Sequence, residues 1–190
     1  MIISHKHEFI FFHIPKTGGS SLTTHLRKHG EIERRYHPHS FSFDLNREFF
    51  RFGFFRNPWD RFVSKYFYFK AYGKQKKGND FHSGEIVNRY NSFREFTLNL
   101  SNVYEEFRSP HWNLQVNWIK DRIDFIGRFE NFQQDVNIVC DKIGIPHQNL
   151  PHKKKSNHIH YTEYYDDETR SIVAEKYAKD IEYFGYKFGE

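Results

Sequence analysis

An apolar segment that leads through a glycine-rich turn into a helix places the strongest constraint on how this chain folds. Residues 9–26 read FIFFHIPKTGGSSLTTHL, which predicts a buried strand over 8–14 and a helix over 19–29 that ends at Gly30. A strand that turns sharply into a helix presents backbone N–H groups and the positive end of the helix dipole. The segment is therefore predicted to bind an anion.

The lysine of this loop stands before the glycines instead of after them. The order G-x-x-x-x-G-K-[ST] of nucleoside-triphosphate-binding loops is absent, which disfavours a kinase or an ATPase. An ordinary strand-to-helix turn with a surface lysine is the alternative. The residues predicted to hold the anion are Lys16, Thr17, Gly18, Gly19, Ser20 and Ser21.

A second candidate anion site follows the next apolar run. RFGFFR, residues 51–56, predicts a strand, and Asn57 is placed to cap the helix after it. Arg56 at the strand end and Ser64 two turns into the helix could hold one phosphate. The alternative is that the arginine pairs with Asp60 and the serine faces solvent. Ligands of α/β sheets bind at the carboxyl ends of strands, which favours a functional site over coincidence.

The remaining pattern alternates strands and helices along the chain. A third strand is expected over 124–129, and a last helix over 166–185. Between them a core-facing helix that ends before Gly144 is predicted by apolar residues at helical spacing: Phe129, Phe132, Val136, Val139 and Ile143. The polar, basic stretch 71–91 is expected to be a mobile loop that could cover the substrate, and 145–161 a loop that closes over a cofactor. The alternation predicts a single α/β domain over 1–190 with a mainly parallel sheet.

The formal charge of +5 and the isoelectric point of about 9.1 favour an anionic partner without choosing among nucleotides, acidic polysaccharides and nucleic acid. A single cysteine, Cys140, excludes an intramolecular disulfide and is expected to be a small buried hydrophobe. No apolar run approaches 18 residues, so we expect no membrane span and a cytoplasmic location.

Four segments resemble the PAPS-dependent carbohydrate sulfotransferases of the heparan sulfate 2-O-sulfotransferase type and their small bacterial relatives. FIFFHIPKTGGSS is similar to the 5′-phosphosulfate loop of that family, and FGFFRNPWDRFVSKYFYF to its 3′-phosphate motif. DFIGRFENFQQDVNIVCDKIGI and YTEYYDDETRSIVAEKYAKDIEYFGYKF resemble C-terminal blocks of the bacterial members. The resemblance implies a P-loop NTPase-like three-layer fold, with a mainly parallel central sheet flanked by helices.

The resemblance also implies a reaction, in which the sulfuryl group of 3′-phosphoadenosine 5′-phosphosulfate (PAPS) moves to a hydroxyl and the bisphosphate PAP is released. No metal is required. Lys16 would contact the leaving phosphate oxygen, the loop would hold the 5′-phosphate, and Arg56 with Ser64 would hold the 3′-phosphate. Three residues of the loop that closes over the nucleotide are further expected ligands: Lys155, Ser156 and Tyr161.

A histidine is suited to take a proton near neutral pH. RYHPHSFSF, residues 35–43, resembles a Tyr-His-Gly-His stretch of the family in which the second histidine is the base. His39 is therefore the expected base, with His37 as a supporting or substrate-contacting residue. Pro38 stands where that pattern has glycine, so the two roles could be exchanged. A metal-binding histidine pair is the poorer interpretation.

The expected acceptor is a hydroxyl-bearing molecule, most plausibly a saccharide, with no nucleic-acid partner and no indication of the oligomeric state. Two other functions stay open. A non-catalytic module that binds sulfated glycan or nucleic acid would explain the charge and would bind less tightly as salt increases. A nucleotide kinase with a variant loop is the other alternative. The absence of the G-x-x-x-x-G-K-[ST] order disfavours it.

Overall fold

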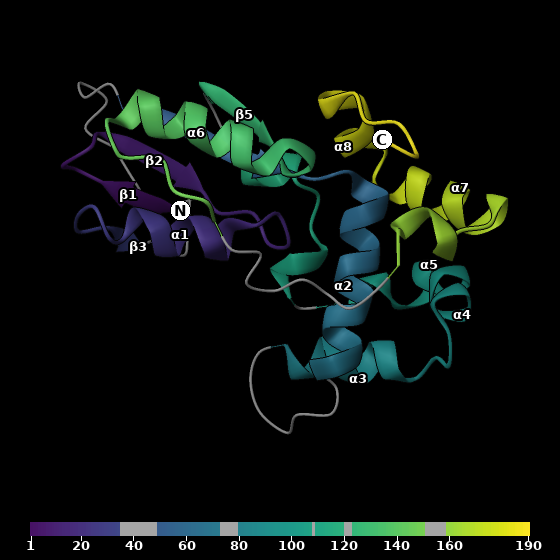
Figure 1. Ribbon diagram of the computed structural model, residues 1–190. Helices are drawn as coiled ribbons and strands as arrows, with labels where there is room; N and C mark the ends of the chain where they lie inside the picture. The colour runs from purple at the N-terminus through teal and green to yellow at the C-terminus, as the bar shows by residue number, and fades with distance from the viewer. Residues whose placement is uncertain (35–48, 73–79, 108, 120–122, 151–158) are drawn as a thin grey trace. The chain divides into compact units, whose positions relative to one another are not determined.

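The computed structural model describes residues 1–34, 49–72, 80–107, 109–119, 123–150 and 159–190. The chain divides into two compact units, each made of two stretches (Figure 1). The first unit consists of Met1–Arg56 and Asn117–Lys154, and the second of Asn57–Val116 and Lys155–Glu190. The single domain over 1–190 stays a prediction.

The first unit is built on a five-stranded sheet. Its strands are β1 (Ile2–Ser4), β2 (Phe9–Phe12), β3 (Glu33–Arg34), β4 (Phe50–Phe55) and β5 (Phe125–Arg128), in the order β3-β1-β2-β4-β5. β4 runs parallel to both β2 and β5, whereas β1 runs antiparallel to both β2 and β3. The sheet is therefore mixed: β2, β4 and β5 are parallel, as expected, and β1 runs against its two neighbours. The connection between β1 and β2 is too short for the crossover that parallel strands need.

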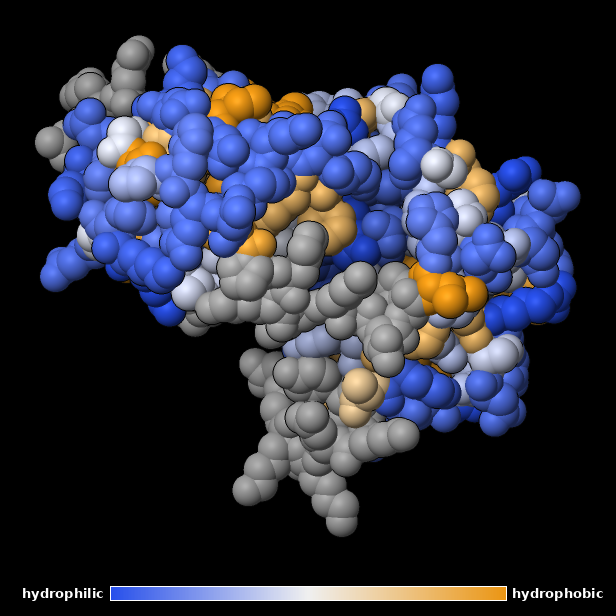
Figure 2. Space-filling view, in the orientation of Figure 1, coloured by the Kyte–Doolittle hydropathy of each residue, from blue (hydrophilic) through white to orange (hydrophobic). Residues whose placement is uncertain are grey.

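Two helices of this unit, α1 (Gly19–Leu26) and α6 (Phe132–Ile143), pack on one face of the sheet. One core cluster joins the alternate strand residues of that face to both helices: Phe9, Phe11, Phe52, Phe54, Leu22, Leu26, Val136 and Val139. The helices also meet each other, since Sγ of Cys140 lies 3.6 Å from Nε2 of His25. The outward side of the two helices is mostly hydrophilic (Figure 2). Among the described residues of this unit the arrangement has two layers, so the three-layer fold is not confirmed.

The strand and helix boundaries follow the sequence pattern closely in this unit. The strands predicted over 8–14, 51–56 and 124–129 appear as β2, β4 and β5. A short 3₁₀ helix, η5 (Phe129–Asn131), precedes α6, so the long helix starts later than the apolar spacing indicates. Gly144 ends α6 in the left-handed conformation, with φ of 68°, as its position predicts.

The second unit is helical. It contains α2 (Pro58–Tyr72), α3 (Phe81–Asn88), α4 (Phe93–Leu98), α5 (Leu100–Val103), α7 (Asp167–Lys176) and α8 (Ala178–Phe184). The 3₁₀ helices η2 (Tyr104–Glu106), η3 (Pro110–Trp112) and η6 (Tyr161–Tyr164) belong to it, while η4 (Val116–Trp118) straddles the chain boundary between the units. The last predicted helix is divided at Tyr177 into α7 and α8.

Aromatic rings fill the core of the second unit, where Phe62, Phe96 and Trp112 lie in mutual ring contact. Helix α3 lies within 71–91, so the expected loop is wrong for Phe81–Asn88. Its Ile86 and Val87 side chains are fully buried in the same core. This burial stabilises a helix in a stretch that is otherwise polar.

Candidate anion-binding site of the first unit

The loop after β2 changes direction within five residues. The N–H of Ile14 donates to the carbonyl of Phe12 at 3.0 Å, and the hydroxyl of Thr17 donates to the carbonyl of Ile14 at 3.0 Å. Lys16 has φ of 71° and Gly18 has φ of 82°, both in the left-handed region. A non-glycine residue there carries strain on the order of 1–3 kcal/mol. The backbone at Lys16 is therefore held by its surroundings.

Both glycines of the loop are required by close packing. A Cβ on Gly18 would lie 2.6 Å from Cε2 of Phe132, and a Cβ on Gly19 would lie 2.3 Å from Cδ2 of His13. Real Cβ atoms do not approach ring atoms so closely. The loop thus rests its backbone directly on two rings, one from α6 and one from the segment after β2.

His13 is tied to the first turn of α1 through Thr23. The hydroxyl of Thr23 donates to the carbonyl of Gly19 at 2.6 Å and lies 3.4 Å from Nδ1 of His13. The ring also stacks on Phe11, with centroids 5.6 Å apart. His13 therefore links the strand, the loop and the helix.

The start of α1 has the electrostatics of an anion site. Gly18 is the N-cap and offers no side chain to the first turn, which also contains no acidic residue. The first backbone N–H groups of a helix have no helical carbonyl to bind, and they stand at the positive end of its dipole. Ser20 is exposed and Ser21 half-buried at this end. The arrangement can hold a phosphate or a sulfate group.

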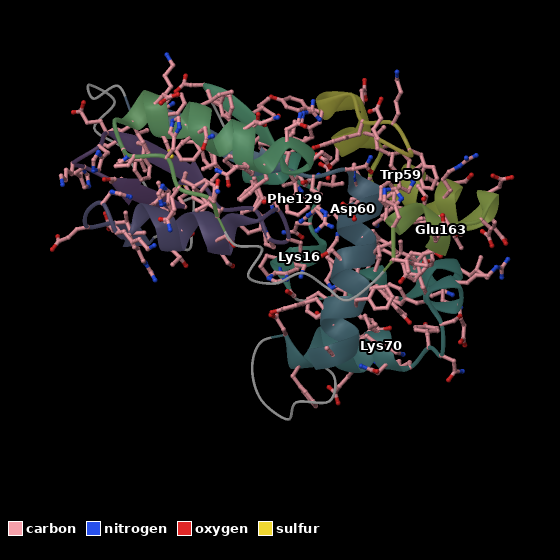
Figure 3. The ribbon with its side chains drawn as sticks, in the orientation of Figure 1. Lys16, Trp59, Asp60, Lys70, Phe129 and Glu163 are labelled. Carbon is pink, nitrogen blue, oxygen red and sulfur yellow. The ribbon has the colours of Figure 1, made fainter. Side chains whose placement is uncertain are left out.

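Arg56 reaches the same loop from the end of β4. Its Nη1 donates to the carbonyl of Lys16 at 3.2 Å, and its guanidinium lies over the ring of Phe129, 4.2 Å from the centroid. Only 8% of the Arg56 surface is exposed. Lys16 and Phe129 lie at the same end of the first unit (Figure 3).

The structure brings together seven of the predicted site residues at the carboxyl ends of β2 and β4: Lys16, Thr17, Gly18, Gly19, Ser20, Ser21 and Arg56. Ser64 and Tyr161 belong to the second unit. Four others lie outside the described residues: His37, His39, Lys155 and Ser156.

Two placements, those of Thr17 and Tyr161, differ from the sequence interpretation, and the burial of Ser64 decides between its two alternatives. The Thr17 side chain is fully buried and its hydroxyl proton goes to the carbonyl of Ile14, so this hydroxyl is not the anion donor that was expected. Ser64 is 2% exposed, which excludes the solvent-facing alternative.

Tyr161 is 4% exposed, and its ring packs with Phe188 in the core of the second unit. Its hydroxyl accepts from the N–H of Gly189 at 2.6 Å and donates to the carbonyl of Glu190 at 3.2 Å. This burial disagrees with a ring that lies against a nucleotide. Tyr161 holds the end of the chain instead.

Sequence reasoning missed the three rings that support the loop, His13, Phe129 and Phe132. His13 stands only three residues before Lys16, but nothing in a single sequence shows that its ring lies under Gly19. Phe129 was assigned to an apolar helix face, whereas it stacks on Arg56. The contacts of Phe129 with Arg56 and of Phe132 with Gly18 join segments more than seventy residues apart in the chain, so no local pattern predicts them.

Cys140 behaves as the sequence indicates. It is buried, and burial with the nearby Asp141 charge raises the pKa of its thiol to about 11. The thiol is therefore not a nucleophile at neutral pH. Among the residues that the structure describes, no three or more His, Cys, Asp or Glu side chains are grouped to hold a metal ion. None of the described helices has the length and apolar character needed to cross a membrane.

Comparison with known proteins gives one match that covers nearly the whole chain. Residues 1–187 match the model described as "Sulfotransferase family". An uncharacterized protein of Archaeoglobus fulgidus is 36% identical over 98 residues, which cover 51% of this chain and 69% of that protein. Carbohydrate sulfotransferase 14 of Danio rerio is 26% identical over 167 residues, 74% of this chain, and the match spans less than half (44%) of that relative. No solved structure matches.

Proposed function

Because the chain belongs to the sulfotransferase family, we propose that it transfers the sulfuryl group of PAPS to a hydroxyl of a saccharide. The observation that carries the proposal is the geometry of the loop Lys16–Ser21, a glycine turn that leads into the first turn of α1 within the matched region. The saccharide is proposed from the Danio rerio relative, whose name describes a carbohydrate sulfotransferase.

The residues of the loop fit the 5′-phosphosulfate end of the donor. The two glycine positions have no room for a Cβ, so the backbone N–H groups of the first turn can approach an anion without side chains between. Lys16 adds a positive charge at the point where the loop leaves β2. Arg56 is proposed to bind the 3′-phosphate, and Ser64 is proposed as a further ligand on the sequence pattern alone.

PAPS supplies an activated sulfuryl group and leaves as PAP. The acceptor oxygen forms a bond to sulfur as the bond from sulfur to the 5′-phosphate oxygen breaks, in line with it. Lys16 is proposed to stabilise the negative charge that develops on that phosphate oxygen. His39 is proposed to take the proton of the acceptor hydroxyl, with His37 in support, on the sequence pattern alone.

The proposal is tested in two steps with the whole chain. First, PAP and, as a matched control, 5′-AMP are titrated in a thermal-shift assay and by calorimetry. PAP at one hundred times its Kd is expected to stabilise the protein by about 2.7 kcal/mol, and 5′-AMP less. If PAP neither binds nor shifts the melting temperature, the nucleotide assignment is wrong.

Second, PAPS labelled with radioactive sulfur is incubated with the protein and a panel of saccharides, phenols and lipids. Transfer to a saccharide supports the proposal, and transfer only to a phenol or a lipid overturns its acceptor class. If the chain binds PAP but labels nothing, the non-catalytic anion-binding module becomes the better function. A parallel reaction with labelled ATP tests the nucleotide kinase.

A further inference from the structure

The backbone of Lys16 adopts a conformation that a lysine does not choose by itself. Its φ of 71° lies in the left-handed region, where the Cβ of an L-residue is crowded by the backbone. The next residue but one, Gly18, is also left-handed but is a glycine and carries no such strain. Something outside the loop must therefore favour this conformation at Lys16.

Arg56 provides the contact. The hydrogen bond from Nη1 of Arg56 ends on the carbonyl oxygen of Lys16, at 3.2 Å. That carbonyl belongs to the peptide plane that also carries the N–H of Thr17. A bond that fixes the plane therefore sets both the direction in which the chain leaves Lys16 and the entry into the glycine turn.

The arginine is itself held in place. Its guanidinium lies 4.2 Å from the centre of the Phe129 ring, and the residue is 8% exposed. Phe129 begins η5 directly after β5, while Arg56 directly follows β4, and β4 and β5 are parallel neighbours. A stacked guanidinium has a fixed plane and carries donors in a fork, so one bond to a carbonyl is compatible with another to an anion.

We propose that Arg56 is a positioning residue for Lys16. The arginine that binds the 3′-phosphate then also fixes the backbone of the lysine that contacts the leaving oxygen. The nucleotide part of this inference rests on the proposed function. It follows that recognition of the 3′-phosphate is coupled to the chemical step and not only to donor affinity.

The contact between Arg56 and Lys16 can be tested without measuring enzyme activity. In the free protein, the ¹³C and ¹⁵N resonances of Lys16 and Thr17 report the backbone conformation. Arg56→Gln is expected to move these resonances toward values typical of negative φ, and Phe129→Leu to move them in the same direction. Arg51→Gln, an arginine on the same strand, is the matched control and is expected to leave them in place. Unmoved resonances in Arg56→Gln overturn the inference whatever nucleotide the protein binds.

The kinetic test compares PAPS with adenosine 5′-phosphosulfate, which lacks the 3′-phosphate. An arginine that only binds the 3′-phosphate affects KM for PAPS and has no effect on the second donor. A positioning residue also lowers kcat with PAPS, here by at least about tenfold in Arg56→Gln, and lowers kcat/KM with the second donor. An unchanged kcat/KM with adenosine 5′-phosphosulfate overturns the coupling.

Arg56→Lys keeps the charge but loses the planar fork, and serves as the second variant if Arg56→Gln folds poorly. It is expected to show the same loss in kcat. If instead it restores the wild-type kcat, charge alone is sufficient and the inference is wrong. If the wild-type chain neither binds PAP nor transfers sulfate, the proposed function fails, while the resonance test still decides the contact between Arg56 and Lys16.

Discussion

Nζ of Lys65 donates a hydrogen bond to the hydroxyl of Tyr177 at 2.8 Å, and the lysine is fully buried. The nitrogen also lies 4.3 Å from the centre of the Tyr177 ring. Burial, with the nearby Arg61 charge, holds the pKa of Lys65 well below its usual range, and Asp180 offsets only part of this. Burial in the core of the second unit therefore disfavours the protonated form of Lys65.

Lys65→Met is expected to change how stability depends on pH. The unfolded chain binds a proton at Lys65 more tightly than the folded chain does, so the free energy of unfolding rises with pH between the lowered pKa of the folded state and about 10.5, by as much as about 1.4 kcal/mol per pH unit. Lys65→Met removes this dependence and is expected to stabilise the protein most at neutral pH. Urea unfolding between about pH 7 and pH 9.5 measures the slope.

The matched control is Lys179→Met, an exposed lysine of α8, which should keep the wild-type slope. The upper limit of pH matters because burial raises the pKa of Tyr165 and Tyr177. Those hydroxyls ionise in the unfolded chain first, so they lower stability above about pH 10. The same slope in Lys65→Met and the wild type would show that Lys65 is charged when buried.

Gly19→Ala is expected to weaken PAP binding at least about tenfold, or about 1.4 kcal/mol. The added Cβ would meet the His13 ring at 2.3 Å, so the first turn of α1 must shift. Isothermal calorimetry with PAP checks this. Gly144→Ala is the control, because its φ of 68° costs about 1 kcal/mol of stability while its Cβ meets nothing within 4 Å.

The double variant Gly19→Ala with His13→Ala tests whether the steric clash with the His13 ring, and not another effect of Gly19→Ala, weakens PAP binding. Removal of the ring gives the Cβ space, and part of the lost PAP affinity should return. If the double variant binds as weakly as Gly19→Ala, contact with His13 is not the reason for the glycine.

Lys16→Ala is expected to lower kcat by about 10²–10³-fold, the usual effect of removing one group that stabilises charge in a transition state. PAP affinity should fall by a smaller factor, since the backbone N–H groups remain. Single-turnover rates with saturating PAPS measure the effect. Lys28→Ala removes a lysine whose Nζ donates to Gln148, and should retain full activity. A Lys16→Ala enzyme with weak PAP binding but normal kcat would assign Lys16 to binding alone.

His39→Ala is expected to reduce kcat/KM for the acceptor by about 10²–10⁴-fold and to leave the Kd for PAP unchanged. A base must be unprotonated to act, so the wild-type rate rises with pH through the pKa of the base, and this limb should vanish in the variant. The control is His37→Ala, which should keep the limb. The reverse pattern would exchange the two roles, as Pro38 allows.

Asn57→Ala is expected to cost about 1–3 kcal/mol of stability by removing a buried amide that joins three segments of the second unit. Its Nδ2 donates to the carbonyl of Lys187 at 2.8 Å and to Tyr161 Oη at 3.3 Å, and its Oδ1 accepts from the N–H of Trp59 at 3.1 Å. Chemical unfolding measures the loss. Asn102→Ala, an exposed asparagine, should be nearly neutral.

The family and the central loop could be predicted without coordinates. The apolar run of β2, the two glycines and the following helix are a local pattern, and the cap at Asn57 is confirmed by its bond to the N–H of Trp59. The helical α3 was missed because its buried residues, Ile86 and Val87, are surrounded by polar ones and a loop interpretation was equally consistent with them.

The sequence by itself determined which short segments form strands and helices and where the glycine turn leads into α1, because dihedral preferences and side-chain periodicity act over a few residues. Only the tertiary structure decided that Arg56 holds the carbonyl of Lys16, that the ring of His13 lies under Gly19, and that Tyr161 is buried. The bond of Arg56 and the burial of Tyr161 depend on which distant segments pack together. The His13 ring is placed by how its own strand packs against the helix that follows, so all three are decided by packing and not by local pattern. For the same reason, a lysine that reads as polar in the sequence is a buried amine in the fold.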